Sequence, residues 1–169
     1  MLGARGTRCI LGLRDVMDDP AQLAKEWERK NVVPALRDLT VDDLPRAAEI
    51  LDDVTFRRVR HIITENQRVL DTVAALDAEG PTAIGDLLTA SHASMRDDFE
   101  ISVPELDLAV ETALAAGTLG ARMTGGGFGG CIVALLPQAR VPALQARIAA
   151  EYRAPGGEAA PVWVCEAAP

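Results

Sequence analysis

Residues 121–137 read ARMTGGGFGGCIVALLP, and this stretch decides which fold the chain can adopt. A short segment that can be extended, Ala121–Thr124, is followed by five glycines in six residues and then by the apolar run Cys131–Leu136. Apolar runs of this length, bounded by glycine and proline, are typical of buried strands. We therefore predict an antiparallel hairpin over residues 121–136, with its glycine connection exposed at one edge of the sheet.

Helical periodicity dominates the sequence before the hairpin and returns after it. Apolar residues recur every three or four positions, with charged residues mostly between them. The spacing predicts helices over residues 40–53, 56–79, from Pro81 past Met95, 102–117 and 142–152. This order of helices, strand, glycine loop, strand and helix indicates an α+β fold with antiparallel pairing, not repeated βαβ units.

Local signals refine the ends of these elements. Thr40 followed by Asp43 is typical of a helix start, and Ser102 followed by Glu105 predicts a capping box. Within the helix over 142–152, we expect Leu144, Ile148 and Ala149 to face inward. The apolar segment Val162–Cys165 predicts a last short strand.

Composition limits the class of protein. The chain has 169 residues, of which 49% are hydrophobic and 25% charged, so it can bury a core without disulfides. Its net charge of -8 comes entirely from the residues after position 60, where acids outnumber arginines. An acidic chain of this kind lacks the basic surface that nucleic-acid backbones require. We therefore exclude a nucleic-acid partner.

Cysteine usage and the N-terminus indicate the compartment. Cys9, Cys131 and Cys165 form an odd set without CxxC spacing, and the last two stand in apolar runs typical of small core residues. This favours a reducing environment. The first residues contain arginines and no apolar run long enough for a signal peptide or a membrane span. We expect a cytoplasmic protein without a membrane partner.

The glycine loop is the strongest chemical signal. Gly125, Gly127 and Gly130 satisfy GxGxxG, but a dinucleotide-binding loop needs a helix after it, and here a strand follows. The Walker loop is excluded because no lysine follows Lys30. Two interpretations remain: backbone that approaches phosphates closely, or a hairpin connection that is merely rich in glycine.

The other polar constellations do not predict a catalytic residue or a metal ligand. His61 and His92 lie on different helices and share no spacing with cysteines, and the serines around His92 do not face it. Cys131 within a strand has no activating base. The segment Arg96–Glu100 is interpreted as a solvated helix end, with a charged interdomain contact as the alternative.

Residues 120–137, GARMTGGGFGGCIVALLP, resemble the third signature motif of the galactokinases, which belong to the GHMP superfamily of small-molecule kinases. Residues 56–69, FRRVRHIITENQRV, and residues 91–114, SHASMRDDFEISVPELDLAVETAL, resemble the preceding helices of that family in order and spacing. The resemblance is close over residues 55–136 and looser toward the C-terminus.

The resemblance implies a fold and a site. The fold is the GHMP C-terminal domain, an antiparallel ferredoxin-like sheet covered by helices and preceded by helical segments. It assigns residues 41–169 to this domain and leaves residues 1–40 as a poorly matching remnant of the upstream region. The residues that it places on the phosphate side of the active site are Met123, Thr124, Gly125, Gly126, Gly127 and Phe128. Gly129 and Gly130 then shape the turn, and Arg122 is a candidate cation.

The resemblance also implies an activity, the ATP- and Mg²⁺-dependent phosphorylation of galactose to galactose 1-phosphate. The family's sugar motif, serine-rich nucleotide loop, catalytic aspartate and arginine belong to an N-terminal half that has no counterpart in these residues. We therefore expect a truncated C-terminal portion that is inactive alone. Sugar, ATP and Mg²⁺ would be bound mainly by the missing half. We also expect this portion to self-associate through an apolar interface. The alternatives are a non-catalytic sugar sensor that binds regulatory partners, and a fragment without function.

Overall fold

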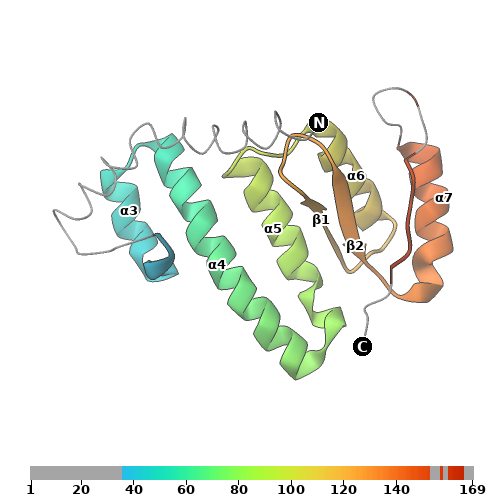
Figure 1. Cartoon of the computed structure of the whole chain (residues 1–169), viewed down its shortest axis with the longest axis horizontal. Coiled ribbons are helices and arrows are strands. Elements are labelled where there is room, and N and C mark those ends of the chain that lie inside the picture. Colours follow the sequence, from blue (N-terminus) through green and yellow to red (C-terminus); the bar gives the residue numbers. More distant parts are fainter. Residues whose placement is uncertain (1–35, 153–156, 158–159, 166–169) are drawn as a thin grey trace, which may run out of the picture. The chain divides into compact units, whose positions relative to one another are not determined.

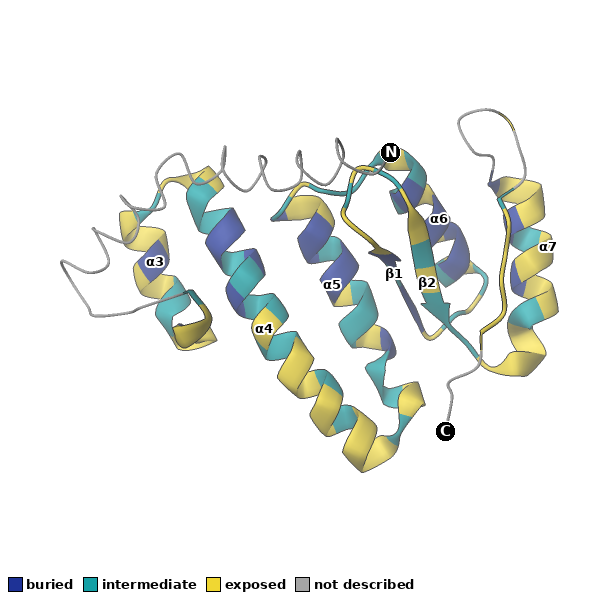
Figure 2. Cartoon of the chain, in the orientation of Figure 1, coloured by how far each residue is buried: buried dark blue, intermediate teal, exposed yellow. Residues whose placement is uncertain are grey.

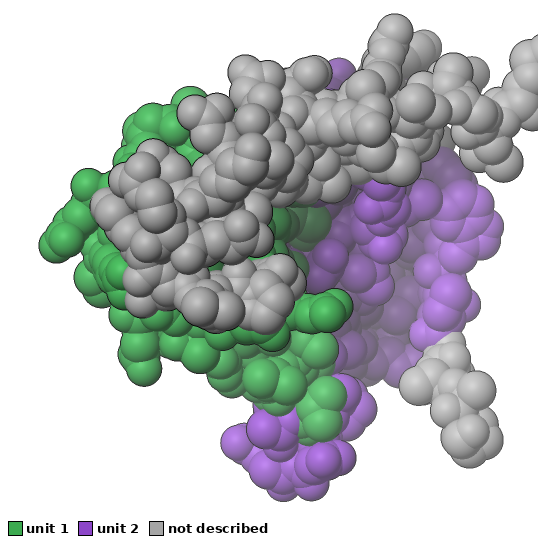
Figure 3. Space-filling model, turned by 60° about the vertical axis from the view of Figure 1, so that its left-hand side comes forward, with its two compact units in different colours: residues 1–73, 93–100 green, residues 74–92, 101–169 purple. Residues whose placement is uncertain are grey.

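The computed structural model describes residues 36–152, 157 and 160–165. The described residues form two compact units, which are distinguished in Figure 3. The first contains residues 36–73 and 93–100, and the second contains residues 74–92 and those from 101 onward. Each unit is described by itself. The predicted remnant over residues 1–40 and Cys9 lie wholly or mostly outside the described residues.

The order of elements follows the predicted order closely (Figure 1). Short 3₁₀ turns occur at Leu36–Asp38, Val41–Asp43, Pro81–Ile84 and Gln138–Arg140. The longer elements are α3 (Leu44–Ile50), α4 (Asp53–Glu79), α5 (Gly85–Asp97), α6 (Pro104–Ala115), β1 (Gly120–Thr124), β2 (Cys131–Leu135) and α7 (Val141–Glu151). The α+β class is confirmed, with a two-stranded antiparallel sheet among the described residues.

The first unit begins at the predicted cap. The backbone N–H of Thr40 donates to the Asp43 carboxylate at 2.9 Å, so this capping signal is confirmed, although α3 ends at Ile50, three residues before the predicted end. Ala47 packs there with Leu39 and with two residues of α4, Val59 and Ile63, in a small buried core. Apolar burial of this kind is the main contribution to the stability of the unit.

Helix α4 changes character along its length. Figure 2 shows buried residues in its first turns and exposed residues toward its end. The apolar periodicity continues past the buried part, so that Val69, Leu70 and Val73 are more than half exposed. The amphipathic pattern thus predicts the helix correctly, but only its N-terminal half buries its apolar face in the described structure.

The second unit is built on the predicted hairpin, which is confirmed. Strands β1 and β2 pair antiparallel, with Gly120 opposite Leu135 and Thr124 opposite Cys131. Ala121 is completely buried and packs with Val110 of α6 and Leu144 of α7, and the partly buried Ile132 and Ala134 of β2 pack against the same core. One face of the hairpin is therefore covered by helices, and Arg122 and Val133 lie on the other.

Two glycines bring the beginning of α5 against the beginning of β1. A Cβ atom on Gly120 would lie 2.0 Å from the Gly85 carbonyl oxygen, and one on Gly85 would lie 2.2 Å from the Leu119 carbonyl oxygen. These glycines are needed because backbone approaches backbone, not because of their φ angles. The contact positions α5, and with it His92, beside the strand that leads into the glycine loop.

Several expectations about burial are wrong. Strand β2 is at most half-buried and Cys131 is exposed, because the outer face of the hairpin has no cover among the described residues. Cys165 is exposed as well. Val162–Cys165 is not a strand, and Trp163 is 71% exposed. Ala149 of α7 is exposed, whereas Leu144 and Ile148 are buried as predicted.

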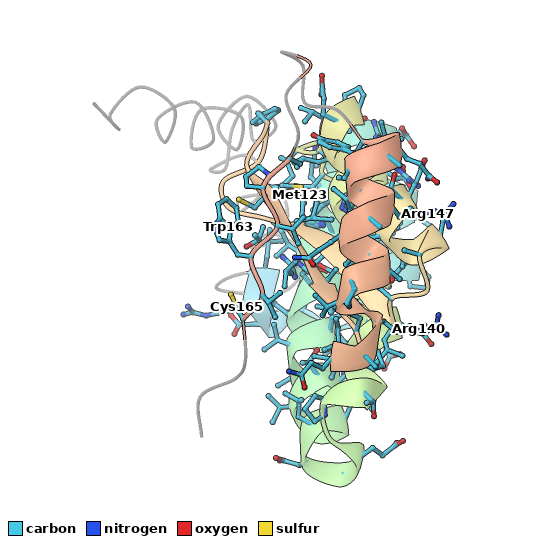
Figure 4. The ribbon with its side chains drawn as sticks, turned by 90° about the vertical axis from the view of Figure 1, so that its right-hand side faces the viewer. Met123, Arg140, Arg147, Trp163 and Cys165 are labelled. Atoms are coloured by element: carbon cyan, nitrogen blue, oxygen red, sulfur yellow. The ribbon has the colours of Figure 1, made fainter. Side chains whose placement is uncertain are left out.

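Figure 4 shows Trp163 and Cys165 on the opposite flank from Arg140 and Arg147. None of the helices in the described part of the chain is both long enough and apolar enough to cross a membrane.

Candidate functional site

The connection between the strands has a backbone that few residue types can adopt. Four of its glycines have positive φ angles: 104° at Gly125, 85° at Gly127, 132° at Gly129 and 115° at Gly130. Side chains other than glycine are strained in this region, which explains why the sequence concentrates glycine here. The connection is exposed over most of its length, as predicted.

Phe128 is the exception in this loop. It has a φ of 58°, and the residue is 58% exposed. A strained non-glycine backbone persists only where its surroundings hold it. Here the Phe128 N–H donates to the Ile101 carbonyl oxygen at 2.8 Å. The loop also touches Ile101 at Gly127, where an added Cβ would lie 2.9 Å from the Ile101 Cβ.

The other end of the loop is anchored in the core. Met123, labelled in Figure 4, is completely buried, so its side chain does not line an open surface. Its backbone N–H donates to Nδ1 of His92, a buried residue of α5, at 3.2 Å. Of the residues named from the resemblance, Met123 is therefore an anchor, and Thr124, Gly125, Gly126 and Phe128 form the exposed part of the loop.

His92 and Ser102 converge on Asp107, a residue of α6 that the sequence analysis did not single out. Nε2 of His92 lies 3.2 Å from Oδ1 of Asp107, and the Ser102 hydroxyl donates to the same oxygen at 2.5 Å. The capping-box prediction is wrong, because Val103 is the N-cap and makes no side-chain cap. A spacing of five residues between Ser102 and Asp107 is the signal that could have indicated this bond instead.

Among the described residues, three glycines of the loop have space beside them. No described atom lies within 4 Å of the position that a Cβ would take on Gly125, Gly126 or Gly129. Thr124 is exposed where β1 ends, next to these glycines in the chain. Arg122 belongs to the outer face of β1, and its Nε donates to the Met123 carbonyl oxygen at 3.1 Å.

The end of α5 in the first unit is only partly the solvated helix end that the charge pattern suggested, because Arg96, Asp97 and Glu100 are exposed but Asp98 is not. Asp98 is buried and accepts hydrogen bonds from Arg60 of α4, at 3.1 Å from Nε, and from Ser94, at 3.2 Å. Arg57 and Arg58 both hold Glu100, whose φ is 56°. The hydrogen bonds from Arg58 and then Arg57 lower the pKa of the Glu100 carboxyl.

His61 belongs to the same cluster of side chains as Arg60, Ser94 and Asp98. Its ring stacks on Phe99 with the centroids 4.4 Å apart, and its Nδ1 lies 3.0 Å from the Ser94 hydroxyl oxygen. Because the Ser94 hydroxyl donates to Asp98, Nδ1 of His61 is the donor in its contact with Ser94. The cluster is thus an ordered network that joins α4 to the end of α5.

The described residues contain no group of three or more histidine, cysteine or acidic side chains that could hold a metal ion. The exposed glycine backbone does fit a phosphate group, because phosphates bind to closely approaching backbone N–H groups.

Two comparisons with known proteins bear on the fold. Residues 72–154 match the family model described as GHMP kinases C terminal. The structure is similar to the crystal structure of Lactococcus lactis galactokinase complexed with galactose, with a TM-score of 0.75 and 33% sequence identity. The match covers 90% of this chain and 38% of that one, so the chain spans well under half of the galactokinase. Residues 72–154 thus resemble the C-terminal domain of the GHMP kinases, and the chain is similar to the matching portion of a galactokinase.

Proposed function

We propose that this chain supplies the phosphate-facing wall of a galactokinase-like active site, in which galactose is phosphorylated by ATP. The observation that carries the proposal is the exposed glycine loop, with open space around Gly125 and Gly126 and strained backbone at Phe128. The match of residues 72–154 to a kinase family model, and the similarity of the chain to a galactokinase that was crystallised with galactose, support the choice of reaction and sugar. We also propose that residues 41–169 form the GHMP kinase C-terminal domain.

The proposed chemistry of the loop is electrostatic. ATP supplies the transferred phosphoryl group, and catalysis of such transfer depends mainly on positioning and on stabilising charge at the phosphate oxygens. Backbone N–H groups of Gly125, Gly126 and Gly127 would donate to these oxygens, and the Thr124 hydroxyl would add a further donor. Preorganised donors of this kind need little rearrangement during the reaction.

The same argument predicts that the 169 residues alone do not phosphorylate galactose. The site requires groups that orient the sugar hydroxyl and hold Mg²⁺, and the described residues offer one wall of donors. Losing the orientation of the reactants can forfeit about 7–11 kcal/mol of barrier reduction. Nucleotide affinity should also be weak, because a chain with a net charge of -8 repels a polyphosphate.

A hybrid enzyme tests the proposal. In Lactococcus lactis galactokinase, the portion that matches this chain would be replaced by this chain, and turnover of galactose with Mg-ATP would be measured. We expect turnover by the hybrid and none above background by the chain alone. A folded hybrid without turnover would contradict the proposed role of this chain in the active site. Turnover by the chain alone would contradict the prediction that the 169 residues are inactive by themselves.

Gly126→Val is the sharpest variant for this assay. The valine side chain meets no described atom within 4 Å of its Cβ, and Gly126 is not among the positive-φ residues, so the fold should tolerate it. The same side chain would occupy the space through which a phosphate approaches the loop. We expect a fall in kcat of about 10²-fold or more at unchanged thermal stability. An active hybrid with this substitution would exclude the loop from the phosphate site.

A further inference from the structure

Both ends of the glycine loop are tied to residues outside the hairpin. At its start, the Met123 N–H donates to His92 Nδ1 at 3.2 Å, and at its end, the Phe128 N–H donates to the Ile101 carbonyl oxygen at 2.8 Å. Between these two bonds the loop contains Thr124 and three glycines, and glycine has the largest backbone freedom of any residue. The two bonds therefore limit where the intervening N–H groups can point.

One carboxylate connects the two anchors. Oδ1 of Asp107 accepts the Ser102 hydroxyl at 2.5 Å, and Ser102 directly follows Ile101 in the chain. The same oxygen lies 3.2 Å from His92 Nε2. Hence the path Met123, His92, Asp107, Ser102, Ile101, Phe128 runs from one end of the loop to the other.

The contacts also assign the tautomer of His92. Nδ1 must be the acceptor, because its partner is the backbone N–H of Met123. In the neutral ring the proton then lies on Nε2, which is 3.2 Å from Oδ1 of Asp107 but makes no hydrogen bond to it. A carboxylate beside the Nε2–H group stabilises this tautomer and so keeps Nδ1 available to Met123. Asp107 can therefore act on the loop without touching it.

We propose that Asp107 is a positioning residue for the glycine loop, acting on its start through His92 and on its end through Ser102. The consequence for catalysis rests on the proposed function, since it requires that the loop donates to the transferring phosphate. Displacement of catalytic donors by about 1 Å can cost on the order of 10²-fold in rate. A network that orients the ends of a glycine-rich loop thus affects kcat more than the affinity for the sugar.

The first arm of the test needs no activity. Amide hydrogen exchange of the 169-residue chain would be measured by NMR for the wild type, Asp107→Ala and the conservative Asp107→Asn. We expect Asp107→Ala to speed exchange at Met123 and Phe128 about 10-fold or more relative to Val110 and Ala113, two core positions of α6. Asp107→Asn should restore part of the protection, because its amide oxygen still accepts hydrogen bonds.

Two further variants keep this arm decisive if Asp107→Ala does not fold. Ser102→Ala removes one contact to Asp107 and should speed amide exchange more at Phe128 than at Met123. His61→Asn is the matched control, because His61 is also a buried helical histidine but belongs to the first unit. Exchange at Met123 and Phe128 that changes no more than at the core amides, or changes equally in His61→Asn, would overturn the proposal.

Two additional measurements separate positioning from stability. Nitrogen chemical shifts of the His92 ring should show the Nε2–H tautomer in the wild type, and a predominant Nδ1–H tautomer would overturn the proposal. In the galactokinase hybrid, Asp107→Ala should lower kcat by 10- to 100-fold while the KM for galactose stays within twofold, with rescue by Asp107→Asn.

The two proposals fail in different ways. An inactive wild-type hybrid contradicts the proposed function, while the exchange measurement still decides whether Asp107 positions the loop. Faster loop exchange with an unchanged kcat in an active hybrid would overturn the catalytic part of the inference alone.

Discussion

At the scale of single residues, Gly127 is constrained twice. Its φ of 85° disfavours any side chain, and an added Cβ would lie 2.9 Å from the Ile101 Cβ and 3.0 Å from the Ile101 oxygen. Gly126, its neighbour, has neither constraint. The two positions therefore form a matched pair, in which the same substitution tests opposite environments.

We expect Gly127→Ala to lower the free energy of unfolding by about 1–3 kcal/mol, because it adds both backbone strain and a close contact. Gly126→Ala should change it by less than about 0.5 kcal/mol. Urea denaturation of both variants is the measurement. Equal stabilities for the two variants would contradict the loop geometry.

At the scale of elements, α4 begins on a side-chain cap. The Thr55 N–H donates to Asp52 at 3.0 Å, and the Thr55 hydroxyl donates to the other Asp52 oxygen at 2.6 Å. Both bonds lower the pKa of the Asp52 carboxyl, and the bond from the Thr55 hydroxyl has the larger effect. Asp52→Ala should destabilise the chain by about 1 kcal/mol, whereas Asp52→Asn should retain most of the cap. Thermal unfolding compares them, and a similar loss for both variants would argue against capping.

Glu100 links α4 to the end of α5 and makes stability depend on pH. Its pKa in the folded chain lies below the ordinary value of 4.5, so the folded state binds fewer protons than the unfolded state between these two values. The stabilising contribution is therefore complete above pH 4.5 and is lost as the pH falls through the folded pKa.

The corresponding variant is Glu100→Gln. Because the Glu100 side chain is 48% exposed, solvent screens its ion pairs, and we expect a loss of about 1 kcal/mol or less at pH 7. The difference from the wild type should shrink as the pH falls below 4.5. Denaturation curves at a series of pH values measure this, and a difference that grows toward acid pH would contradict the assigned direction.

At the scale of the whole molecule, the exposed apolar residues predict self-association. Val69, Leu70 and Val73 lie on neighbouring turns of α4 and are 62%, 63% and 53% exposed. A contiguous apolar stripe of this kind favours association of copies, because its contact with water is unfavourable. Sedimentation velocity should show concentration-dependent association that Leu70→Glu reduces. Monomers at high concentration, or association unaffected by this substitution, would contradict the prediction.

The site was only partly predictable, because some of its features follow from local composition and others from contacts between residues that are distant in the sequence. The glycine loop is local, and its composition alone indicates unusual backbone angles. Asp107 was missed because it lies in an ordinary helical pattern, and its partner Ser102 looks like a helix cap. Only the folded chain shows that Ser102 donates to Asp107 instead.

Local sequence is enough to predict the helices, the hairpin over residues 121–136 and the exposed glycine connection. Each of these depends on periodicity and on backbone preferences, which act over a few neighbouring residues. The cap at Thr40 belongs to the same class, since both of its partners lie within one turn.

The tertiary structure decided which distant groups meet. Met123 finds His92, 31 positions earlier in the chain, and Asp98 is buried against Arg60 instead of facing water. It also left Val162–Cys165 outside a strand, because a strand requires a partner edge and apolar composition does not provide one. Hydrogen-bond partners and burial depend on how helices and strands pack, and that packing cannot be predicted from a local pattern of residues.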